Sequence, residues 1–324
     1  MAPLFSDTLI TIIGGSGFVG RHIVRALARR GYRLRVAVRR PDLAGHLQPL
    51  GRSGQIAPVQ ANVRFPVSLA AACDGAYAVI NLVGVLYSAG AQSFDAVHVF
   101  GAEASAKAAK AAKARLFIQM SALGANAESE SQYARSKAEG EARARAAFPG
   151  AAVIRPSVIF GPEDGLFNRF AGLARVSPFL PLIGGGATRF QPVFVGDIAE
   201  AFAKLVDSPE LAGSTFEFGG PEIFTLRQIL EYTLATIERR RLLLPIPWGI
   251  ARIMGAVMGM LPRPMLTRDQ VELLRSDSVV SGDAKDTNRT LEGLGISPAG
   301  IEAIVPAYLY RYRKAGQFTA PSGI

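Results

Sequence analysis

A glycine-rich turn directly after the first predicted strand restricts the fold of this chain more than any other feature. The apolar run 9–13 leads into the segment GGSGFVG, in which glycines stand at positions 14, 17 and 20. Glycine lets the backbone turn tightly, approach a diphosphate without a Cβ and pack the next helix closely against the sheet. The helix N-terminus supplies amide donors to the phosphates. The turn therefore predicts a dinucleotide site formed by Gly14, Ser16, Gly17, Phe18, Val19 and Gly20.

The first half of the chain alternates short apolar runs with alanine-rich segments, a pattern typical of consecutive βαβ units. We expect strands at residues 9–13, 34–38, 56–60, 78–82, 116–120 and 152–155. We expect helices at residues 19–30, 67–72, 94–112 and 132–148. Six strands joined by helical crossovers predict an α/β fold with a doubly wound parallel Rossmann sheet.

The pattern changes after about residue 160, where prolines and glycines divide the chain into shorter pieces. We therefore expect a nucleotide-binding Rossmann domain over residues 1–165 and a smaller C-terminal α+β lobe over residues 166–324. Residues 188–218 are expected, in part, to return to the Rossmann sheet. Residues 190–195 predict a strand that enters a helix, and Thr225 can cap a helix beginning at Leu226.

Two arginines stand at the end of the second predicted strand. Proteins that prefer NAD(H) usually carry Asp or Glu there, which accepts hydrogen bonds from the ribose hydroxyls. This chain has Arg39 and Arg40 instead, and a guanidinium can pair with a 2′-phosphate. The sequence therefore predicts NADPH as the cofactor, with NAD(H) less favoured. The alternative is that both arginines are solvated and that Asp42 accepts the ribose.

Further cofactor contacts are predicted where two other strands end. Asn62 can hydrogen-bond the adenine edge, with Val63 beside it, and Leu82-Val83-Gly84 continue the fourth strand under the cofactor. The carboxyl ends of parallel strands share one edge of the sheet, so these residues can line one site.

Three residues have the order expected of an oxidoreductase site. Tyr133 and Lys137 are four positions apart on one predicted helix, and Ser121 follows the preceding strand. In such a site Tyr133 acts as general acid or base, Lys137 lowers its pKa and holds the nicotinamide ribose, and Ser121 steadies a substrate oxygen. The alternative is an ordinary, half-exposed pair on a helix.

The glycine turn, Ser121 with Tyr133 and Lys137, and the segment 155–162 together resemble the extended and atypical short-chain dehydrogenases/reductases. The resemblance implies that Pro156, Ser157 and Val158 lie beside the nicotinamide. One departure bears on catalysis, because only twelve positions separate Ser121 from Tyr133, about half the separation usual in extended members of the family.

Within that family the chain resembles the Rossmann-type accessory subunit of respiratory complex I and its bacterial relatives, over nearly its whole length. The segments that carry this resemblance are residues 120–125, 133–141, 160–164, 167–170, 190–193 and 266–272. It implies a bound NADPH that serves structure rather than turnover, beside the quinone-reducing part of a membrane complex. The alternative function is an active NADP-dependent reductase or epimerase that uses Tyr133 on a small carbonyl, isoprenoid or sugar-nucleotide substrate.

Composition narrows the class of partner. The formal charge of +10 favours anionic partners, and no zinc-finger or RNA-binding signature favours nucleic acid. A lone cysteine, Cys73, and a start without signal-peptide character predict a cytoplasmic protein. His22, His46 and His98 lack metal-ligand spacing, so no metal is expected.

An apolar stretch in the second lobe suggests a membrane-proximal role. Arg239-Arg240-Arg241 precede residues 242–248, and residues 250–261 continue apolar with one charged residue, Arg252. The prolines and glycines argue against a transmembrane helix, whereas basic residues beside apolar ones suit a headgroup interface or the apolar surface of a partner. The resemblance implies that such a partner would be a complex I subunit. We therefore expect a protein that can associate peripherally with the cytoplasmic face of the inner membrane. The alternative is that the stretch packs in the core of its own lobe.

Overall fold

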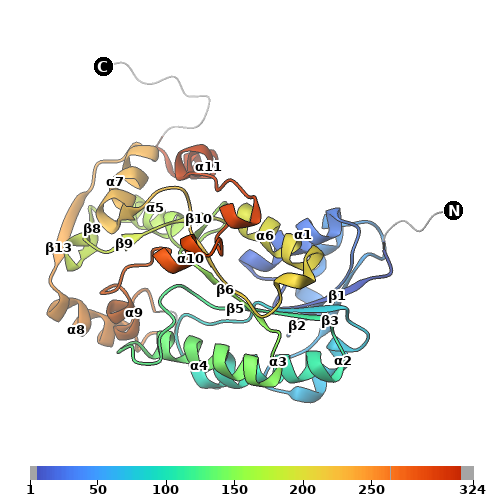
Figure 1. The fold of residues 1–324 in the computed structure, drawn as a ribbon. Helices are drawn as coiled ribbons and strands as arrows, with labels where there is room; N and C mark the ends of the chain where they lie inside the picture. Colours follow the sequence, from blue (N-terminus) through green and yellow to red (C-terminus); the bar gives the residue numbers. More distant parts are fainter. Residues whose placement is uncertain (1–5, 263, 315–324) are drawn as a thin grey trace. The chain divides into compact units, whose positions relative to one another are not determined.

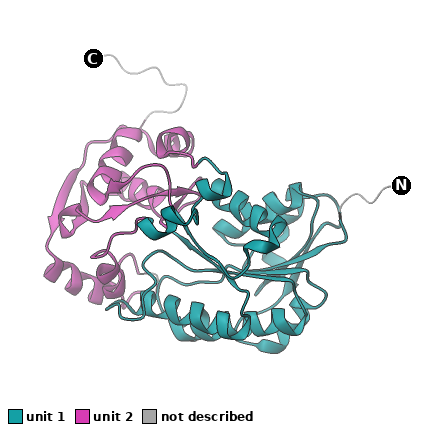
Figure 2. Cartoon of the chain, in the orientation of Figure 1, with its two compact units in different colours: residues 1–156, 196–218, 280–297 teal, residues 157–195, 219–279, 298–324 magenta. Residues whose placement is uncertain are grey.

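The computed structural model describes residues 6–262 and 264–314, which divide into two compact units. Unit 1 contains residues up to 156 together with 196–218 and 280–297, and unit 2 contains the remaining segments (Figure 2). The chain thus passes from unit 1 to unit 2 and returns twice.

A seven-stranded sheet forms the centre of unit 1, and every pairing in it is parallel. Its strands are β1 (Leu9–Ile13), β2 (Arg33–Val38), β3 (Ile56–Gln60), β4 (Ala78–Asn81), β5 (Leu116–Met120), β6 (Ala152–Pro156) and β11 (Thr215–Phe218). The strand order is β11-β6-β5-β4-β1-β2-β3. The expected doubly wound Rossmann sheet is confirmed, with the six predicted strands in place to within one residue at each end and β11 added at one edge.

Helices cover both faces of this sheet (Figure 1). One face carries α1 (Phe18–Arg29) and α6 (Val195–Asp207), and the other carries α2 (Pro66–Cys73), α3 (Phe100–Ala111) and α4 (Gln132–Ala147). The residues that α3 buries are Gly101, five alanines and Ser105, so it can approach its neighbours closely. A Cβ added at Gly140 of α4 would lie 2.2 Å from the carbonyl oxygen of His98, which shows how closely α4 passes the residues just before α3.

A π-helical turn, Asp95–Val99, directly precedes α3. The sequence predicted one continuous helix over residues 94–112, and the structure replaces its first turn by this wider one. Such insertions into helices are frequent at functional sites. The turn carries the buried His98.

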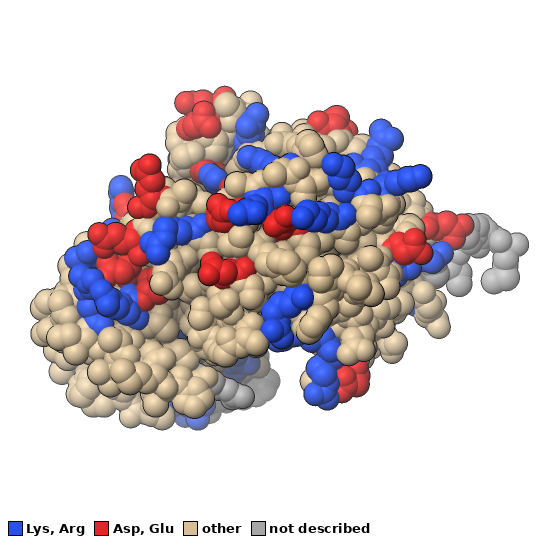
Figure 3. All heavy atoms as spheres, turned by 90° about the horizontal axis from the view of Figure 1, so that it is seen from below, with Lys and Arg blue, Asp and Glu red and all other residues tan. Residues whose placement is uncertain are grey.

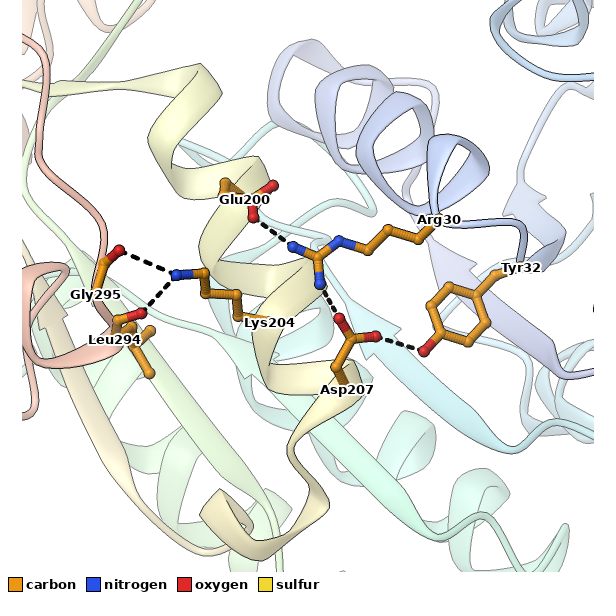
Figure 4. A network of polar contacts seen from close by, with 7 residues as sticks. All are labelled: Arg30, Tyr32, Glu200, Lys204, Asp207, Leu294 and Gly295. Carbon is orange, nitrogen blue, oxygen red and sulfur yellow. Dashed lines mark hydrogen bonds and ion pairs between the residues drawn. The ribbon is translucent and has the colours of Figure 1, made fainter.

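A network of polar contacts ties the returning segments to the start of unit 1 (Figure 4). The Arg30 guanidinium pairs with Glu200 and Asp207 of α6, and the Tyr32 hydroxyl donates to Asp207 at 2.5 Å. Lys204 Nζ donates to the carbonyl oxygens of Leu294 and Gly295 at 2.8 and 3.1 Å. These contacts fix α6 and the segment 280–297, including α10 (Gly282–Asp286), on the Rossmann core.

Unit 2 is built from shorter elements. Its strands are β7 (Ile159–Phe160), β8 (Phe179–Ile183), β9 (Arg189–Phe190), β10 (Val193–Phe194), β12 (Phe224–Thr225) and β13 (Leu242–Ile246), which pair two by two. Its helices are α5 (Phe167–Val176), α7 (Leu226–Thr236), α8 (Trp248–Met258), α9 (Arg268–Leu273) and α11 (Ile301–Leu309). Phe160, Phe167, Leu180 and Ile229 are among the fully buried residues of the main core of this unit.

Two local predictions for unit 2 had different outcomes. Thr225 caps α7 as expected, because its side chain accepts from the Gln228 amide at 3.2 Å in a reciprocal capping box. The prediction of a single strand over residues 190–195 was wrong. The chain instead forms β9, which pairs with β12, and β10, which pairs with β7, before α6 begins. Pro192, which lies between the two short strands, interrupts the ladder since it has no amide hydrogen to donate.

The part of the chain that the structure describes contains no helix long and apolar enough to cross a bilayer.

Candidate functional site

The glycine turn lies where the strand order of the sheet reverses. β1 pairs with β2 on one side and with β4 on the other, so the segments that follow β1 and β4 are neighbours. Gly14 has a φ of +83°, and a Cβ there would lie 3.0 Å from Val83 Cγ2. Ligands of open α/β sheets bind in the crevice at this reversal point. The turn and residues 82–84 therefore form the two sides of one candidate site.

The glycines of the turn differ in what requires them. A Cβ on Gly20 would lie 2.5 Å from Gly15 Cα, so the start of α1 crosses the turn too closely for any side chain. Gly17 has an ordinary φ of −74°, and the nearest atom to a Cβ there is the Gly14 carbonyl oxygen at 3.5 Å. The protein itself can thus accommodate a side chain at position 17, whereas a diphosphate at the helix N-terminus requires that space.

The N-terminus of α1 has the properties of an anion site. Gly17 is its N-cap, no side chain caps the helix, and its first turn contains no acidic residue. The unpaired amides and the dipole of a helix start both attract a phosphate. Ser16, Phe18 and Val19 are half-buried around this start.

Arg39 and Arg40 lie after β2, beside the turn, whose Gly14 amide donates to the Ala37 carbonyl at 2.9 Å. Arg40 makes two hydrogen bonds to the Asp42 carboxylate, at 3.0 and 2.7 Å. Arg39 Nη1 donates to Gln92 Oε1 at 2.7 Å, and this neutral amide does not balance its charge. Arg39 is therefore better placed than Arg40 to pair with a phosphate. Asp42 could accept a hydrogen bond from a ribose hydroxyl only if its hydrogen bonds from Arg40 were broken.

The ends of β3 and β4 supply the other predicted contacts. Asn62 Oδ1 accepts from the Arg64 amide at 3.1 Å, so the oxygen of this side chain is already hydrogen-bonded within its local turn. Val63 is buried, and its Cγ2 would lie 3.0 Å from a Cβ on Gly101 of α3. The Leu82 amide donates to the Ile13 carbonyl at 3.0 Å, which holds residues 82–84 beside the end of β1.

Tyr133 and Lys137 occupy the first two turns of α4. Ser131 caps this helix by accepting from the Ala134 amide at 3.3 Å. Lys137 Nζ lies 5.7 Å from the centroid of the half-exposed Tyr133 ring. Burial lowers the pKa of Lys137 to about 8, with the Glu141 carboxylate opposing the shift. The structure thus brings the two side chains together near the start of α4. Their roles toward a cofactor or substrate stay a prediction.

Ser121 directly follows β5 and is only 4% exposed. Its amide donates to the Ile154 carbonyl at 2.7 Å, but its Oγ has no hydrogen-bond partner within residues 6–262 and 264–314. A buried hydroxyl without a partner is unfavourable. A ligand oxygen is one group that can satisfy it.

His98 is a residue of this region whose importance the sequence did not reveal. Its ring stacks on Phe94 with centroids 5.5 Å apart and meets the Tyr133 ring edge-on at 5.4 Å. Its Nε2 accepts from the Val85 amide and its Nδ1 faces Ser136 Oγ, both at 2.9 Å. Ser136 Oγ donates to the Tyr133 carbonyl at 2.8 Å, so it accepts from Nδ1–H. The contacts thus select one neutral tautomer, which links the segment after β4 to α4.

Burial, with the charge of Lys137 as a second cause, lowers the pKa of His98 to about 3. From the sequence alone His98 is an ordinary residue, because a lone histidine on a helix seldom has a special role. The one signal that the sequence offers is the spacing of Phe94 and His98, which lie four positions apart in a predicted helix and can therefore share a face. No group of three potential metal ligands occurs in the described ranges of the chain.

Pro156, Ser157 and Val158 follow one another across the boundary of the units. Pro156 ends β6 and its carbonyl accepts from the Leu123 amide at 3.0 Å in unit 1. Ser157 belongs to unit 2, where its hydroxyl donates to the Ser278 carbonyl at 2.7 Å. The Val158 carbonyl accepts from the Val193 amide at 3.0 Å. The Ser157 hydroxyl is thus already hydrogen-bonded within unit 2.

Known proteins resemble this chain in family and in fold. Residues 14–156 match the family model described as NAD(P)H-binding. The chain is 34% identical to NADH dehydrogenase (ubiquinone) 1 alpha subcomplex subunit 9 of Arabidopsis thaliana, over 96% of this chain and 79% of the relative. It is 38% identical to a ceramide reductase of Caulobacter vibrioides, over 76% of this chain and 71% of the relative.

A solved structure agrees with the fold. The NADPH complex of an NADPH-dependent quinone oxidoreductase from Escherichia coli superposes with a TM-score of 0.73, over 93% of this chain and 99% of that one. Its sequence is 17% identical, so this likeness concerns the fold alone. The chain thus carries an NAD(P)H-binding Rossmann domain.

Replacing Gly17 by Val should weaken cofactor binding while leaving the stability of the fold nearly unchanged. The side chain would occupy the space at the helix start, so we expect the affinity for NADPH to fall at least about tenfold, while the unfolding free energy changes by about 1 kcal/mol or less. Gly20→Ala is the matched control, because its Cβ meets backbone and should cost about 1–3 kcal/mol. Calorimetric titration and urea unfolding measure the two quantities, and unchanged affinity in Gly17→Val would contradict the assignment.

His98 should make stability depend on pH. Its pKa in the folded protein, about 3, lies below the ordinary 6.5, so the unfolded chain binds more protons between these values. The stability that His98 contributes is complete above pH 6.5 and is lost as the pH falls, by about 1.4 kcal/mol per unit. Urea unfolding at pH 7.0 and 5.5 should show a smaller difference for His98→Asn than for the wild type. The same replacement at the exposed His46 should leave the difference unchanged, and equal differences in all three proteins would refute the prediction.

Proposed function

The chain belongs to the family of the complex I alpha subcomplex subunit 9 proteins, and we propose on this basis that it binds NADPH as a fixed cofactor and serves NADH:ubiquinone oxidoreductase as an accessory or assembly component. The observation that carries the proposal is the extent of the similarity. It spans 96% of this chain and therefore includes both units, not the nucleotide-binding domain alone. A shared dinucleotide fold by itself would not favour this function over any other.

The preference for NADPH is supported by the charge at the end of β2. Arg39 is exposed and bonded to the neutral Gln92 amide, so its positive charge remains available to a 2′-phosphate. Asp42, the carboxylate that follows β2, could accept a ribose hydroxyl only after its two hydrogen bonds from Arg40 were broken. We propose that the turn around Gly17 holds the diphosphate and that Tyr133 and Lys137 hold the nicotinamide ribose.

A role without turnover is supported by the short connection between Ser121 and Tyr133. The Asn126 amide donates to the Ala134 carbonyl at 3.3 Å, so the segment turns straight back onto α4. Little chain is left there to shape a substrate site. In this reading Ser121, Tyr133 and Lys137 retain the cofactor but do not reduce a substrate.

A second candidate function is an active NADPH-dependent reductase or epimerase. It is favoured by the unpartnered Ser121 Oγ, by the Tyr133 and Lys137 pair, and by the similarity to a ceramide reductase. NADPH would supply the hydride in the reductase case, and the Tyr133 hydroxyl would donate the proton to the substrate oxygen. Lys137 would favour the ionised form of that hydroxyl.

We place the protein at the cytoplasmic face of the inner membrane as a peripheral component. The association with complex I is supported by the named relatives, which are mitochondrial subunits of NADH dehydrogenase (ubiquinone). The proposed location rests on that association.

Arg39→Glu should weaken NADPH far more than NADH. The change places a carboxylate where we propose the 2′-phosphate to lie, so we expect a loss of about 1.5–3 kcal/mol for NADPH alone. Arg40→Glu is a control with the same change in net charge, and it should have the smaller effect because Arg40 is already paired with Asp42. Calorimetry with both nucleotides measures the difference, and equal losses for NADPH and NADH would refute the assignment.

The two candidate functions predict different behaviour of the native protein. If it is a component of complex I, it should migrate with NADH:ubiquinone oxidoreductase in native gels of its own membranes and release NADPH on denaturation. Tyr133→Phe should leave that association intact. Migration as a free protein, together with carbonyl-dependent NADPH oxidation that Tyr133→Phe abolishes, would instead establish the reductase.

A further inference from the structure

Helix α8 of unit 2 presents three large aliphatic side chains to the outside. Ile250, Ile253 and Val257 are 54, 67 and 61% exposed, and they lie three and four positions apart, on one face of the helix. The residues that the helix buries are the small Ala251 and Gly255. Trp248 and Met254 are partly buried against a small core with Val271, so the helix packs by one side while its β-branched residues remain exposed on the other.

The inward side of α8 is held by close backbone packing and by charge. A Cβ on Gly255 would lie 2.8 Å from the Arg268 amide nitrogen, at the start of α9, so no larger residue fits there. Arg252 Nε lies 2.8 Å from Glu272 Oε1, a carboxylate whose side chain is 8% exposed. The charged residue of α8 is thus turned toward α9 and neutralised, which leaves the outward face purely apolar.

Neighbouring elements extend this apolar surface. Leu242 and Leu244 of β13 are exposed, as is Phe179 of β8, which pairs in register with Leu242. Met260 and Leu261 after α8 are exposed as well. We call this set the α8 surface; its members are Phe179, Leu242, Leu244, Ile250, Ile253, Val257, Met260 and Leu261. The view from below shows a largely uncharged area at its lower left, the side on which Figure 1 draws α8 (Figure 3).

The charges next to the α8 surface are positive. Arg239, Arg240 and Arg241 directly precede β13, and they line a recess in unit 2 together with Arg227 and Glu231. The only acidic residues between positions 239 and 275 are Asp269 and Glu272. Glu272 is already shared by Arg252 and Arg275. Two further carboxylates lie beside these arginines, but Glu231 pairs with Arg227 and Glu238 with Arg313. Arg239, Arg240 and Arg241 therefore leave an excess of positive charge next to the apolar surface.

From this combination we propose that the α8 surface binds the headgroup and upper acyl region of an anionic lipid bilayer. Exposed aliphatic and Met side chains gain by leaving water, and arginines beside them are attracted to anionic headgroups. No helix in the described ranges can span a bilayer, so the contact lies along the membrane surface. A second copy of the chain fits the α8 surface less well, because the arginines beside its own α8 surface would repel those of the first copy. The inference concerns lipid chemistry alone and does not require that the protein be part of complex I.

Vesicle flotation with the full-length protein tests the proposal. Vesicles of phosphatidylcholine with 30% phosphatidylglycerol should bind at least about tenfold more tightly than vesicles of phosphatidylcholine alone. Ile253→Ser with Val257→Ser should lower binding to the anionic vesicles at least about tenfold. Phe65→Ser with Val67→Ser is the matched control, because it removes exposed apolar side chains from unit 1 and should leave binding unchanged. Arg240→Glu should reduce the preference for anionic over neutral vesicles.

Each contrary result would overturn the proposal. Equal binding to both kinds of vesicle would exclude recognition of anionic headgroups, and equal binding by the α8 and control variants would exclude the α8 surface. Circular dichroism and retained NADPH binding show that each variant is folded. If the α8 changes abolish a concentration-dependent dimer in gel filtration and vesicle binding is absent, a second copy covers this surface. Failure of the complex I association would leave these vesicle results untouched, so the two proposals can fail separately.

Discussion

The close approach of β1 and β4 is the constraint on which the candidate site depends. Where the strand order reverses, the turn after β1 meets residues 82–84, and Gly14 is left with space for a hydrogen but not for an unstrained Cβ. The start of α1 crosses the same turn with Gly20 against Gly15. This packing aims the amides of α1 at the crevice, and it brings His98 and α4 into contact with the segment after β4.

The sequence predicted unit 1 well because its signals are local and agree with one another. Buried parallel strands are continuous apolar runs, and alanine-rich helices between them allow few other folds. The sequence could not show which arginine keeps an unbalanced positive charge. In the fold Arg40 pairs with the Asp42 carboxylate, whereas Arg39 bonds to the neutral amide of Gln92, which is distant in the chain. The position of His98 in the site could not be predicted for a similar reason, because it depends on contacts with Val85, Phe94 and Ser136 that only the fold creates.

Unit 2 was harder to predict because its strands are short and pair across long separations. β9 and β10, each of two residues, belong to different ladders, so a local pattern cannot assign them. The same holds for α8, whose apolar residues suggested a core helix and an interfacial one equally. Burial favours the interfacial prediction, because the fold leaves Ile253 and Val257 exposed while Ala251 and Gly255 face inward.

A cofactor that is not consumed still has a physical effect on the fold. Unit 1 buries the Ser121 hydroxyl, which has no hydrogen-bond partner among the described residues, and the Lys137 amine, whose charged form is disfavoured by burial. A dinucleotide that binds only the folded state stabilises it by RT ln(1 + [L]/Kd), about 4 kcal/mol at a thousand times Kd. This is comparable with much of the net stability of an ordinary domain. The same residues that would serve catalysis can therefore be retained because they bind a ligand that holds the domain together.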